Sequence, residues 1–128
     1  MLLSAEAYRE SLDRYKPRVF VDGVRIERVS SAPQLAPGIA ATGVAYDFAL
    51  RDEHKPLMTA TQATSGKTVN RMLHIGETST DLLYKLEAIR LICRESGCAM
   101  RYLSHDALNA LHQATFMLDA NKKASDAH

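Results

Sequence analysis

Three side chains near position 100 could do chemistry. Cys98 offers a thiol, Arg101 a guanidinium and Tyr102 a phenol, and they follow Gly97 directly. An arginine and a phenol at a junction between two helices can bind an anion or an aromatic ring. The same residues also fit a helix end at which the arginine stem covers apolar surface. Both interpretations stay open, and Arg101 and Tyr102 are candidate substrate-facing residues.

Other familiar catalytic and metal-binding patterns are missing from the sequence. The histidines lack the spacing of a zinc-binding helix and are interpreted as ordinary surface or capping residues. They are His54, His74, His105, His112 and His128. The triplet Gly66-Lys67-Thr68 lacks the glycine that a phosphate-binding loop needs five residues earlier, where Thr61 stands. We therefore expect neither a zinc helix nor a nucleotide-binding loop.

Two amphipathic helices between Thr78 and Leu118 must position the candidate residues. Thr78 and Asp81 form a capping-box-like start for the first helix. Its predicted apolar stripe contains Leu82, Leu83, Leu86, Ile89, Ile92, Cys93 and Ser96, and its polar side contains Lys85, Glu87, Arg90 and Arg94. Gly97-Cys98-Ala99 forms an elbow, and a second helix is predicted to begin near Ser104. Cys93, on the stripe, is interpreted as a core thiol.

The first half of the chain predicts a further layer that covers these helices. A short helix is expected at 4–14 with Ser4 as its cap, and a helix rich in small residues from Pro37 to Arg51. Between them, two β-branched runs joined by Asp22-Gly23 predict a β-hairpin at 18–29. The fold class is therefore mainly α, a helical domain with an N-terminal β-hairpin.

Composition limits the classes of protein to consider. The chain has 128 residues, 46% of them hydrophobic, and a net charge of +1. This predicts one domain at 1–120 and a polar tail at 121–128. Interleaved charges argue against nucleic-acid binding, and no apolar run reaches the roughly 20 residues that span a bilayer. We expect a cytoplasmic protein with no membrane or nucleic-acid partner.

An ordered series of short motifs is similar to a known family. The series runs through the Ala5–Leu12 helix, the Val19–Glu27 hairpin, the Pro37–Ile39 helix start, Leu57–Thr59, Gly66–Arg71, Ser79–Leu82 with Lys85, Arg90-Leu91 and Asp106–Ala110. It resembles the N-terminal domain of the 4-hydroxybutyryl-CoA dehydratase and 4-hydroxyphenylacetate 3-hydroxylase family, and is closer to the dehydratases. The resemblance covers nearly the whole chain.

The resemblance implies an acyl-CoA dehydrogenase-like N-terminal helical domain. In such flavoproteins this domain is followed by a middle β domain and a C-terminal helical bundle, and these later domains make most of the contacts with FAD. The present chain would then be an isolated domain, a truncated reading frame or a small subunit completed by a separate chain. We expect it to be inactive alone and to form a homo- or hetero-oligomer with the remaining flavin-binding domains.

The dehydratases also carry a [4Fe-4S] cluster. The resemblance places one cysteine ligand at Cys98 and the next at Tyr102, where a phenol replaces the thiolate. One thiolate cannot anchor a cluster, so Cys98 stays a candidate metal ligand without its partner. The substrate-contacting arginine and tyrosine of the hydroxylases would fall on Leu103 and Ala107, where neither is retained.

Three functions remain as hypotheses. The first is the substrate-side domain of a flavin-dependent lyase or isomerase that dehydrates a hydroxyacyl-CoA, with Cys98, Arg101 and Tyr102 on the wall that faces the flavin and Ser104 capping the helix. The second is the equivalent domain of a two-component FAD-dependent aromatic hydroxylase. The third is a non-catalytic helical assembly module. An independent metal or redox protein that uses Cys98 is the weakest alternative.

Overall fold

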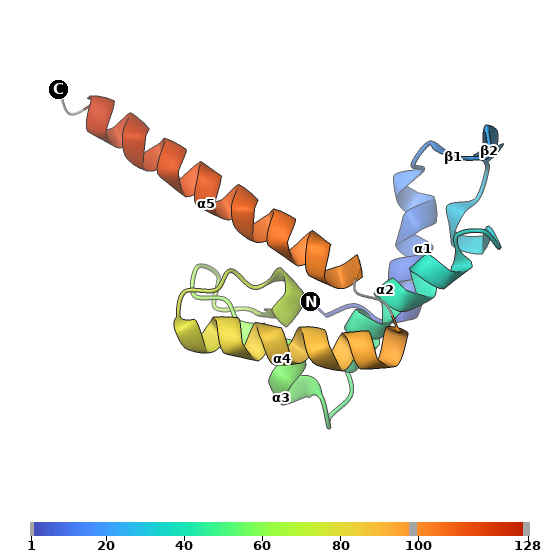
Figure 1. The fold of residues 1–128 in the computed structure, drawn as a ribbon, viewed down its shortest axis with the longest axis horizontal. Helices are drawn as coiled ribbons and strands as arrows, with labels where there is room; N and C mark the ends of the chain where they lie inside the picture. The colour runs from blue at the N-terminus through green and yellow to red at the C-terminus, as the bar shows by residue number, and fades with distance from the viewer. Residues whose placement is uncertain (1, 98–99, 127–128) are drawn as a thin grey trace.

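The computed structural model describes residues 2–97 and 100–126, and helices dominate it (Figure 1). The helices are α1 (Ala5–Tyr15), α2 (Ala36–Phe48), α3 (Lys55–Met58), α4 (Ser79–Ser96) and α5 (Met100–Asp126), with 3₁₀ turns η1 (Val29–Ser31) and η2 (Arg71–Leu73). The strands are β1 (Val19–Val21), β2 (Val24–Ile26), β3 (Thr59–Thr61) and β4 (Thr68–Asn70). The expected mainly α class with an N-terminal hairpin is confirmed.

The first two helices pack closely because small residues meet at their contact. Ser4 caps α1 as predicted, since its Oγ accepts a hydrogen bond from the Ala7 amide at 3.1 Å. A Cβ atom added at Gly43 of α2 would lie 2.8 Å from the Ala5 Cβ, so the helices touch where the side chain is missing. Tyr8 and Tyr46 stack with ring centroids 4.8 Å apart.

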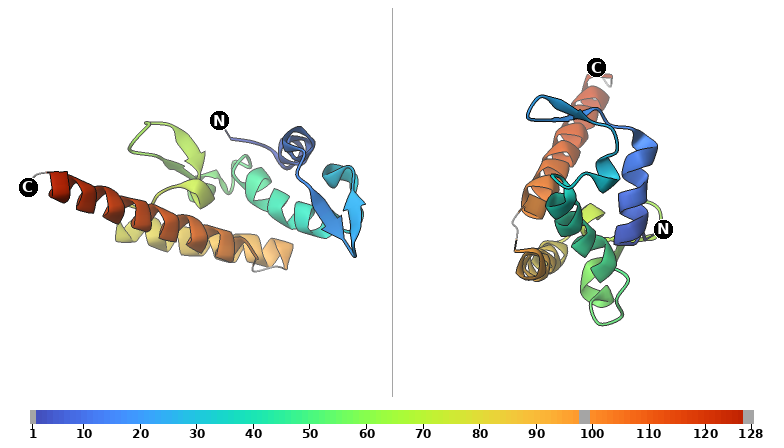
Figure 2. Two further views of the ribbon diagram at one scale, coloured as in Figure 1. Left: turned by 90° about the horizontal axis from the view of Figure 1, so that it is seen from above. Right: turned by 90° about the vertical axis from the view of Figure 1, so that its right-hand side faces the viewer.

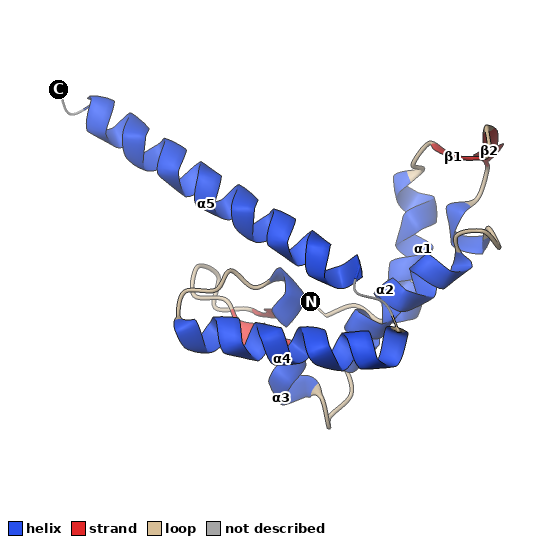
Figure 3. Cartoon of the chain, in the orientation of Figure 1, coloured by secondary structure: helices blue, strands red, loops and turns tan. Residues whose placement is uncertain are grey.

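Two antiparallel hairpins, drawn as red strands in Figure 3, complete the N-terminal half. In the predicted one, Val19 pairs with Ile26, and Asp22 and Gly23 both have positive φ, as a type I′ turn requires. The second hairpin pairs Thr59 with Asn70 and was not expected. Its strands are short and threonine-rich, so no apolar alternation marks them. After α2, a short charged segment leads into α3, which begins at Lys55.

The start of α4 is the capping box that the sequence predicted. Thr78 Oγ1 accepts from the Asp81 amide at 3.1 Å, and Asp81 Oδ2 accepts from the Thr78 amide at 3.0 Å. The core lies between α2, α3, η2 and α4, and Cys93 packs against it as expected. Its buried members are Ala45, Phe48, Ala49, Met58, Met72, Ala88, Ile89 and Ile92.

The face that α4 buries differs from the predicted stripe. Leu82 and Leu86 are 56% and 42% exposed, whereas Lys85, expected on the polar side, is only 2% exposed. The buried residues are Lys85, Ala88, Ile89 and Ile92, which also follow helical spacing. The predicted face of α4 was the one with the larger apolar side chains. The face that is buried is rotated slightly around the helix and includes Lys85.

Helix α5 is longer than predicted and leaves the body of the molecule. It begins at Met100, so Ser104 lies inside the helix instead of capping it, and it continues through the predicted tail to Asp126. Gly97, with φ 61°, ends α4 in the left-handed conformation, which lets the chain turn back before Ser104. Figures 1 and 2 show α5 running back along α4 and diverging from it.

No helix within the described residues is long and apolar enough to cross a lipid bilayer.

Candidate functional site

The predicted site residues lie at the junction between α4 and α5. Arg101 and Tyr102 are in the first turn of α5, but their side chains are outside the described part of the structure. Cys98 lies outside the described residues altogether. Their proposed roles therefore remain predictions. What the structure adds is the set of buried polar groups on the elements that carry this junction.

The buried groups and the partly exposed Asp81 beside them form a polar cluster, which we define as Asn70, Arg71, His74, Asp81 and Lys85. Asn70 is the last residue of β4 and is buried. Its side-chain amide can be buried at little cost because it forms hydrogen bonds with two backbone groups. Its Nδ2 donates to the Ala45 carbonyl of α2 at 2.7 Å, and its Oδ1 accepts from the Met72 amide at 3.0 Å. The second hairpin, the turn η2 and α2 are thereby fixed to one another.

Arg71 joins the short helix α3 to α4. Its Nε donates to the carbonyl of Leu57, and its Nη2 donates to those of Thr59 and Pro56. The guanidinium also lies 5.0 Å from the centre of the Tyr84 ring. Burial lowers the pKa of Arg71, yet an arginine stays charged at any pH at which proteins fold. Its positive charge is therefore a permanent part of the cluster.

His74 and Asp81 form the end of the cluster nearest the start of α4. His74 is 6% exposed, so it is not a surface histidine, but it occupies the C-cap position of η2, which is the other alternative that the sequence left open. Its Nε2 lies 3.5 Å from Asp81 Oδ1, and its Nδ1 has no hydrogen-bond partner among the described residues. Hydrogen bonds from the Thr78 hydroxyl and the Glu77 amide hold the pKa of Asp81 below its usual value, and His74 adds to this.

Lys85 lies deepest in the cluster and reaches α5. Its Nζ donates a hydrogen bond to Asn109 Oδ1 at 3.3 Å. Burial lowers the pKa of Lys85, and the charge of Arg71 lowers it further while Asp81 acts in the opposite sense. A buried lysine is rare because desolvation of the ammonium is costly. The residue is thus the least expected feature of α4.

An open groove of about 360 Å³ lies between α5, the start of α4 and the loop before it. Its lining combines apolar and polar side chains: Ile75, Gly76, Leu82, Asn109, His112, Gln113 and Phe116. Such a groove can hold one side of a flat or elongated ligand. It cannot enclose that ligand, because it is open to solvent. A binding pocket, in contrast, normally buries most of its ligand's surface.

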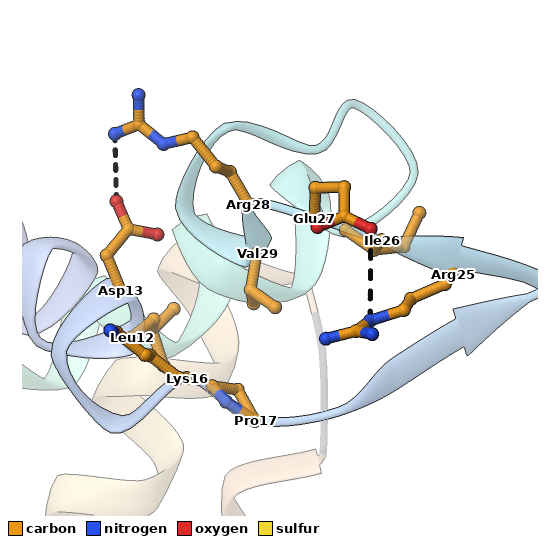
Figure 4. A pocket seen from close by; sticks show the side chains of 9 residues that line it. All are labelled: Leu12, Asp13, Lys16, Pro17, Arg25, Ile26, Glu27, Arg28 and Val29. Carbon is orange, nitrogen blue, oxygen red and sulfur yellow. Dashed lines mark hydrogen bonds and ion pairs between the residues drawn. The ribbon is translucent and has the colours of Figure 1, made fainter.

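A second cavity, of about 440 Å³, lies between the end of α1 and the first hairpin (Figure 4). Four of its charged side chains form two ion pairs: Arg28 Nη2 is 2.9 Å from Asp13 Oδ2, and Arg25 Nε is 3.8 Å from Glu27 Oε1. Ser30 also donates to Asp13 at 2.7 Å and, with Arg28, holds the pKa of that carboxyl below its usual value. We interpret these contacts as ties between α1 and the hairpin.

The residues present do not fit an iron–sulfur cluster. The chain has two cysteines, and Cys93 is partly buried against the core of α4. The described residues contain no group of three or more histidine, cysteine or acidic side chains that could hold a metal ion. Cys98 would be left as a lone thiolate with Tyr102 at the next ligand position, whereas these clusters are normally held by several thiolates.

The sequence did not predict that Lys85, Asn109 and Arg71 lie close together in the folded chain. Lys85 stands three, four and seven residues before Ala88, Ile89 and Ile92, so a buried polar position was readable from helical spacing. No sequence signal links Lys85 to Asn109, because their contact depends on how the helices fold back. The contact becomes visible only in the structure.

Comparisons with known proteins agree with this fold. A family model described as 4-hydroxyphenylacetate 3-hydroxylase N terminal matches residues 4–128. The 4-hydroxybutyryl-CoA dehydratase/vinylacetyl-CoA-Delta-isomerase of Clostridium aminobutyricum is 32% identical over 120 residues, which are 93% of this chain and 24% of that protein. The present chain therefore spans about a quarter of the length of that relative.

A solved structure shows the same arrangement. The oxygen-tolerant archaeal 4-hydroxybutyryl-CoA dehydratase from N. maritimus superposes with a TM-score of 0.84 at 33% identity. The match covers 96% of this chain and 24% of that one, and its fold is acyl-CoA dehydrogenase-like. On the family match over residues 4–128, this chain belongs to the 4-hydroxyphenylacetate 3-hydroxylase N-terminal family.

Proposed function

We propose that this chain supplies the substrate-side N-terminal domain, or a small subunit, of a flavin-dependent enzyme similar to 4-hydroxybutyryl-CoA dehydratase. The reaction would be dehydration or isomerisation of a hydroxyacyl-CoA. The observation that carries the proposal is the similarity to two dehydratases over more than nine-tenths of the chain, at 32% and 33% identity.

In this proposal FAD is bound mainly by protein outside the present chain. The described cavities are open grooves, and an isoalloxazine with an acyl-CoA beside it needs walls on several sides. Arg101 and Tyr102 would face the substrate from the first turn of α5. When bound, FAD would supply the redox chemistry, and these residues would bind and orient the substrate.

Exposed apolar side chains support the need for a completing partner. Leu82 and Leu83 of α4 and Leu111, Phe116 and Leu118 of α5 are all more than half exposed. Apolar side chains in such number on neighbouring helices are typical of a surface that another polypeptide covers. We propose that the flavin-binding part of the enzyme, on a separate chain or as an oligomer, lies against α4 and α5.

A binding and turnover experiment tests the proposal. The purified chain is mixed with FAD and 4-hydroxybutyryl-CoA, alone and with the flavoprotein chain that co-purifies from the source cells. We expect tight FAD binding and product only in the mixture. Tight FAD binding or turnover by the isolated chain would contradict the proposal, as would a stoichiometric partner that carries no flavin.

Point variants test the two substrate-facing residues in the assembled protein. Arg101→Ala and Tyr102→Phe should raise KM or lower kcat for the acyl-CoA while leaving the flavin content unchanged. Lys122→Ala, on an exposed part of α5, is the matched control. Unchanged kinetics in both site variants would exclude these residues from the substrate wall.

The name of the family model favours one second function. It describes 4-hydroxyphenylacetate 3-hydroxylases, so a two-component FAD-dependent aromatic hydroxylase is the alternative. The same mixture, given reduced flavin, oxygen and 4-hydroxyphenylacetate, should then form a hydroxylated phenol. Inactivity with both substrates, together with a partner free of cofactor, would instead indicate the non-catalytic assembly module.

A further inference from the structure

Helix α5 makes little apolar contact with the rest of the described structure. Over residues 106–123, every residue of α5 is exposed except Asn109. Phe116, for example, is 75% exposed. Because the hydrophobic effect scales with the apolar area removed from water, apolar packing contributes little to fixing the direction of this part of α5.

The exception, Asn109, receives a hydrogen bond from Lys85, the largest of the fully buried side chains of α4. Lys85 Nζ donates to Asn109 Oδ1 at 3.3 Å, and Lys85 itself is 2% exposed. An ammonium can only donate, so the contact fixes the carbonyl oxygen of the Asn109 amide toward α4. A lysine held in the core thus joins the body of the molecule to the middle of the departing helix.

The position of this contact makes it sensitive to the angle between the helices. Lys85 lies about 18 Å along α4 from the turn at Gly97, since each helical residue rises 1.5 Å. At that distance, opening the angle by about 5° moves Asn109 by about 1.6 Å relative to the backbone of Lys85. Because Lys85 is 2% exposed, its stem has little room to follow, and the bond therefore constrains the angle.

We propose that Lys85 is a positioning residue, which sets the angle of α5 against α4 through its buried hydrogen bond to Asn109. The exposed apolar residues of α5 are thereby held in one orientation before a partner binds them. Holding a surface in its bound orientation reduces the ordering that association must otherwise impose. This inference does not depend on the chemistry that the completed protein performs.

The charges around Lys85 are consistent with this role. Arg71, from η2, and Asp81, from α4, are the charged groups whose fields act on it, and they oppose each other. Asp81 Oδ2 accepts from the amides of Glu77 and Thr78 and from the Thr78 hydroxyl. The carboxylate of Asp81 is therefore committed to the start of α4, whereas Lys85 donates its hydrogen bond to Asn109.

Nuclear magnetic resonance of the full 128-residue chain tests the proposal. Residual dipolar couplings report whether α5 keeps a fixed direction relative to α4. We expect Lys85→Met and Asn109→Leu to lower the couplings of α5 by about half relative to those of α4, as independent motion of the helices would. Asn121→Leu is the matched control, the same change at an exposed position of α5.

A second readout separates this role from general loss of structure. Asn109→Asp should retain the couplings of α5 and raise the pKa of Lys85, followed at its side-chain resonances, because a carboxylate favours the ammonium. The proposal would be overturned if the dipolar couplings of α5 were unchanged in Asn109→Leu, or if the pKa of Lys85 were unchanged in Asn109→Asp. If Asn109→Leu loses the native core resonances, Asn109→Ala provides the same comparison.

Discussion

Asp81 makes two kinds of contact at the start of α4, and its negative charge strengthens both. Its Oδ2 accepts hydrogen bonds from the Glu77 and Thr78 amides, and its Oδ1 lies 3.5 Å from His74 Nε2. Its lowered pKa means that the folded state binds the proton less tightly than the unfolded chain. The stability contributed by Asp81 is therefore present above the usual aspartate pKa and lost as the pH falls through the lower folded value.

The corresponding variant is Asp81→Asn. We expect it to unfold more easily at neutral pH by about 0.3–1 kcal/mol, the usual contribution of a negative charge at the N-terminus of a helix, because the amide oxygen of asparagine can still accept hydrogen bonds. As the pH falls below the usual aspartate pKa of about 3.9 and through the lower folded value, its stability should converge with that of the parent chain, because protonation then removes the charge from the parent's Asp81. Urea denaturation followed by circular dichroism measures this. Asp119→Asn, exposed on α5, should show neither effect.

Lys85 has the opposite pH dependence. Burial lowers its pKa in the folded chain, so the folded state carries a desolvation penalty whenever Lys85 is charged. As the pH rises from that lowered value toward the usual lysine pKa of about 10.4, the penalty disappears and the free energy of unfolding increases. Lys85→Met should lack this increase, while Lys122→Met should keep it. An identical alkaline profile for Lys85→Met and the parent chain would contradict the assignment.

At the residue scale, the sequence predicts what is encoded locally. Thr78 and Asp81 are three residues apart, and the capping box they predict is present. Lys85 was assigned to the polar side of its helix, but it is buried, as is His74. The spacing of Lys85 from Ala88, Ile89 and Ile92 is a local signal of its burial, whereas its hydrogen bond to Asn109 depends on how α5 folds back and has no local signal.

At the scale of elements, the contact between α1 and α2 makes a direct prediction. Gly43→Ala places a methyl group 2.8 Å from the Ala5 Cβ, so α1 must move away from α2. We expect a loss of about 1–3 kcal/mol in the free energy of unfolding, as for other overpacked contacts. Gly38→Ala, in the same helix with open space around the added methyl, should instead stabilise by about 0.5–1 kcal/mol.

Thermal unfolding distinguishes these two variants, since they carry the same chemical change in one helix. Equal effects would mean that helix propensity, and not the contact with Ala5, determines the stability of this region. A crystal structure of Gly43→Ala with α1 unmoved would give the same conclusion.

The two hairpins show where the prediction of elements ends. Asp22-Gly23 encodes its own turn, so the first hairpin was predictable from two residues. The second is closed by Gly66, with φ 65°, between short strands of threonine, alanine and asparagine. Asn70 and Arg71 fix that hairpin to α2 and α3 through side-chain hydrogen bonds, which a local reading of the sequence does not contain.

At the scale of the whole molecule, the exposed apolar side chains of α5 predict association. Leu111, Phe116 and Leu118 are 60%, 75% and 66% exposed. We expect the isolated chain to bind a hydrophobic dye and to self-associate as its concentration rises. The triple variant Leu111→Ser, Phe116→Ser, Leu118→Ser should reduce both.

Sedimentation velocity over a wide concentration range measures the association. Serine at Ala110, Ala114 and Ala120, which are also exposed on α5, is the matched control and should behave like the parent chain. A strictly monomeric parent chain with little dye binding would show that these side chains need no covering partner. Leu82, Leu86 and Leu108 are exposed as well, so the surface that lacks a covering layer extends over α4 and α5.

The contacts of Arg71 should withstand acid better than the contacts of Asp81 at the start of α4. Its guanidinium keeps its charge, and the carbonyls of Leu57, Pro56 and Thr59 that it binds do not titrate in this range. The Asp81 carboxylate at the start of α4, in contrast, is neutralised in strong acid. Acidification should therefore fray the first turn of α4 while the junction between α3 and β3 is still intact. Acid unfolding would then follow a fixed order. It would begin at the start of α4, where acid neutralises Asp81, and would reach the contacts of Arg71 later.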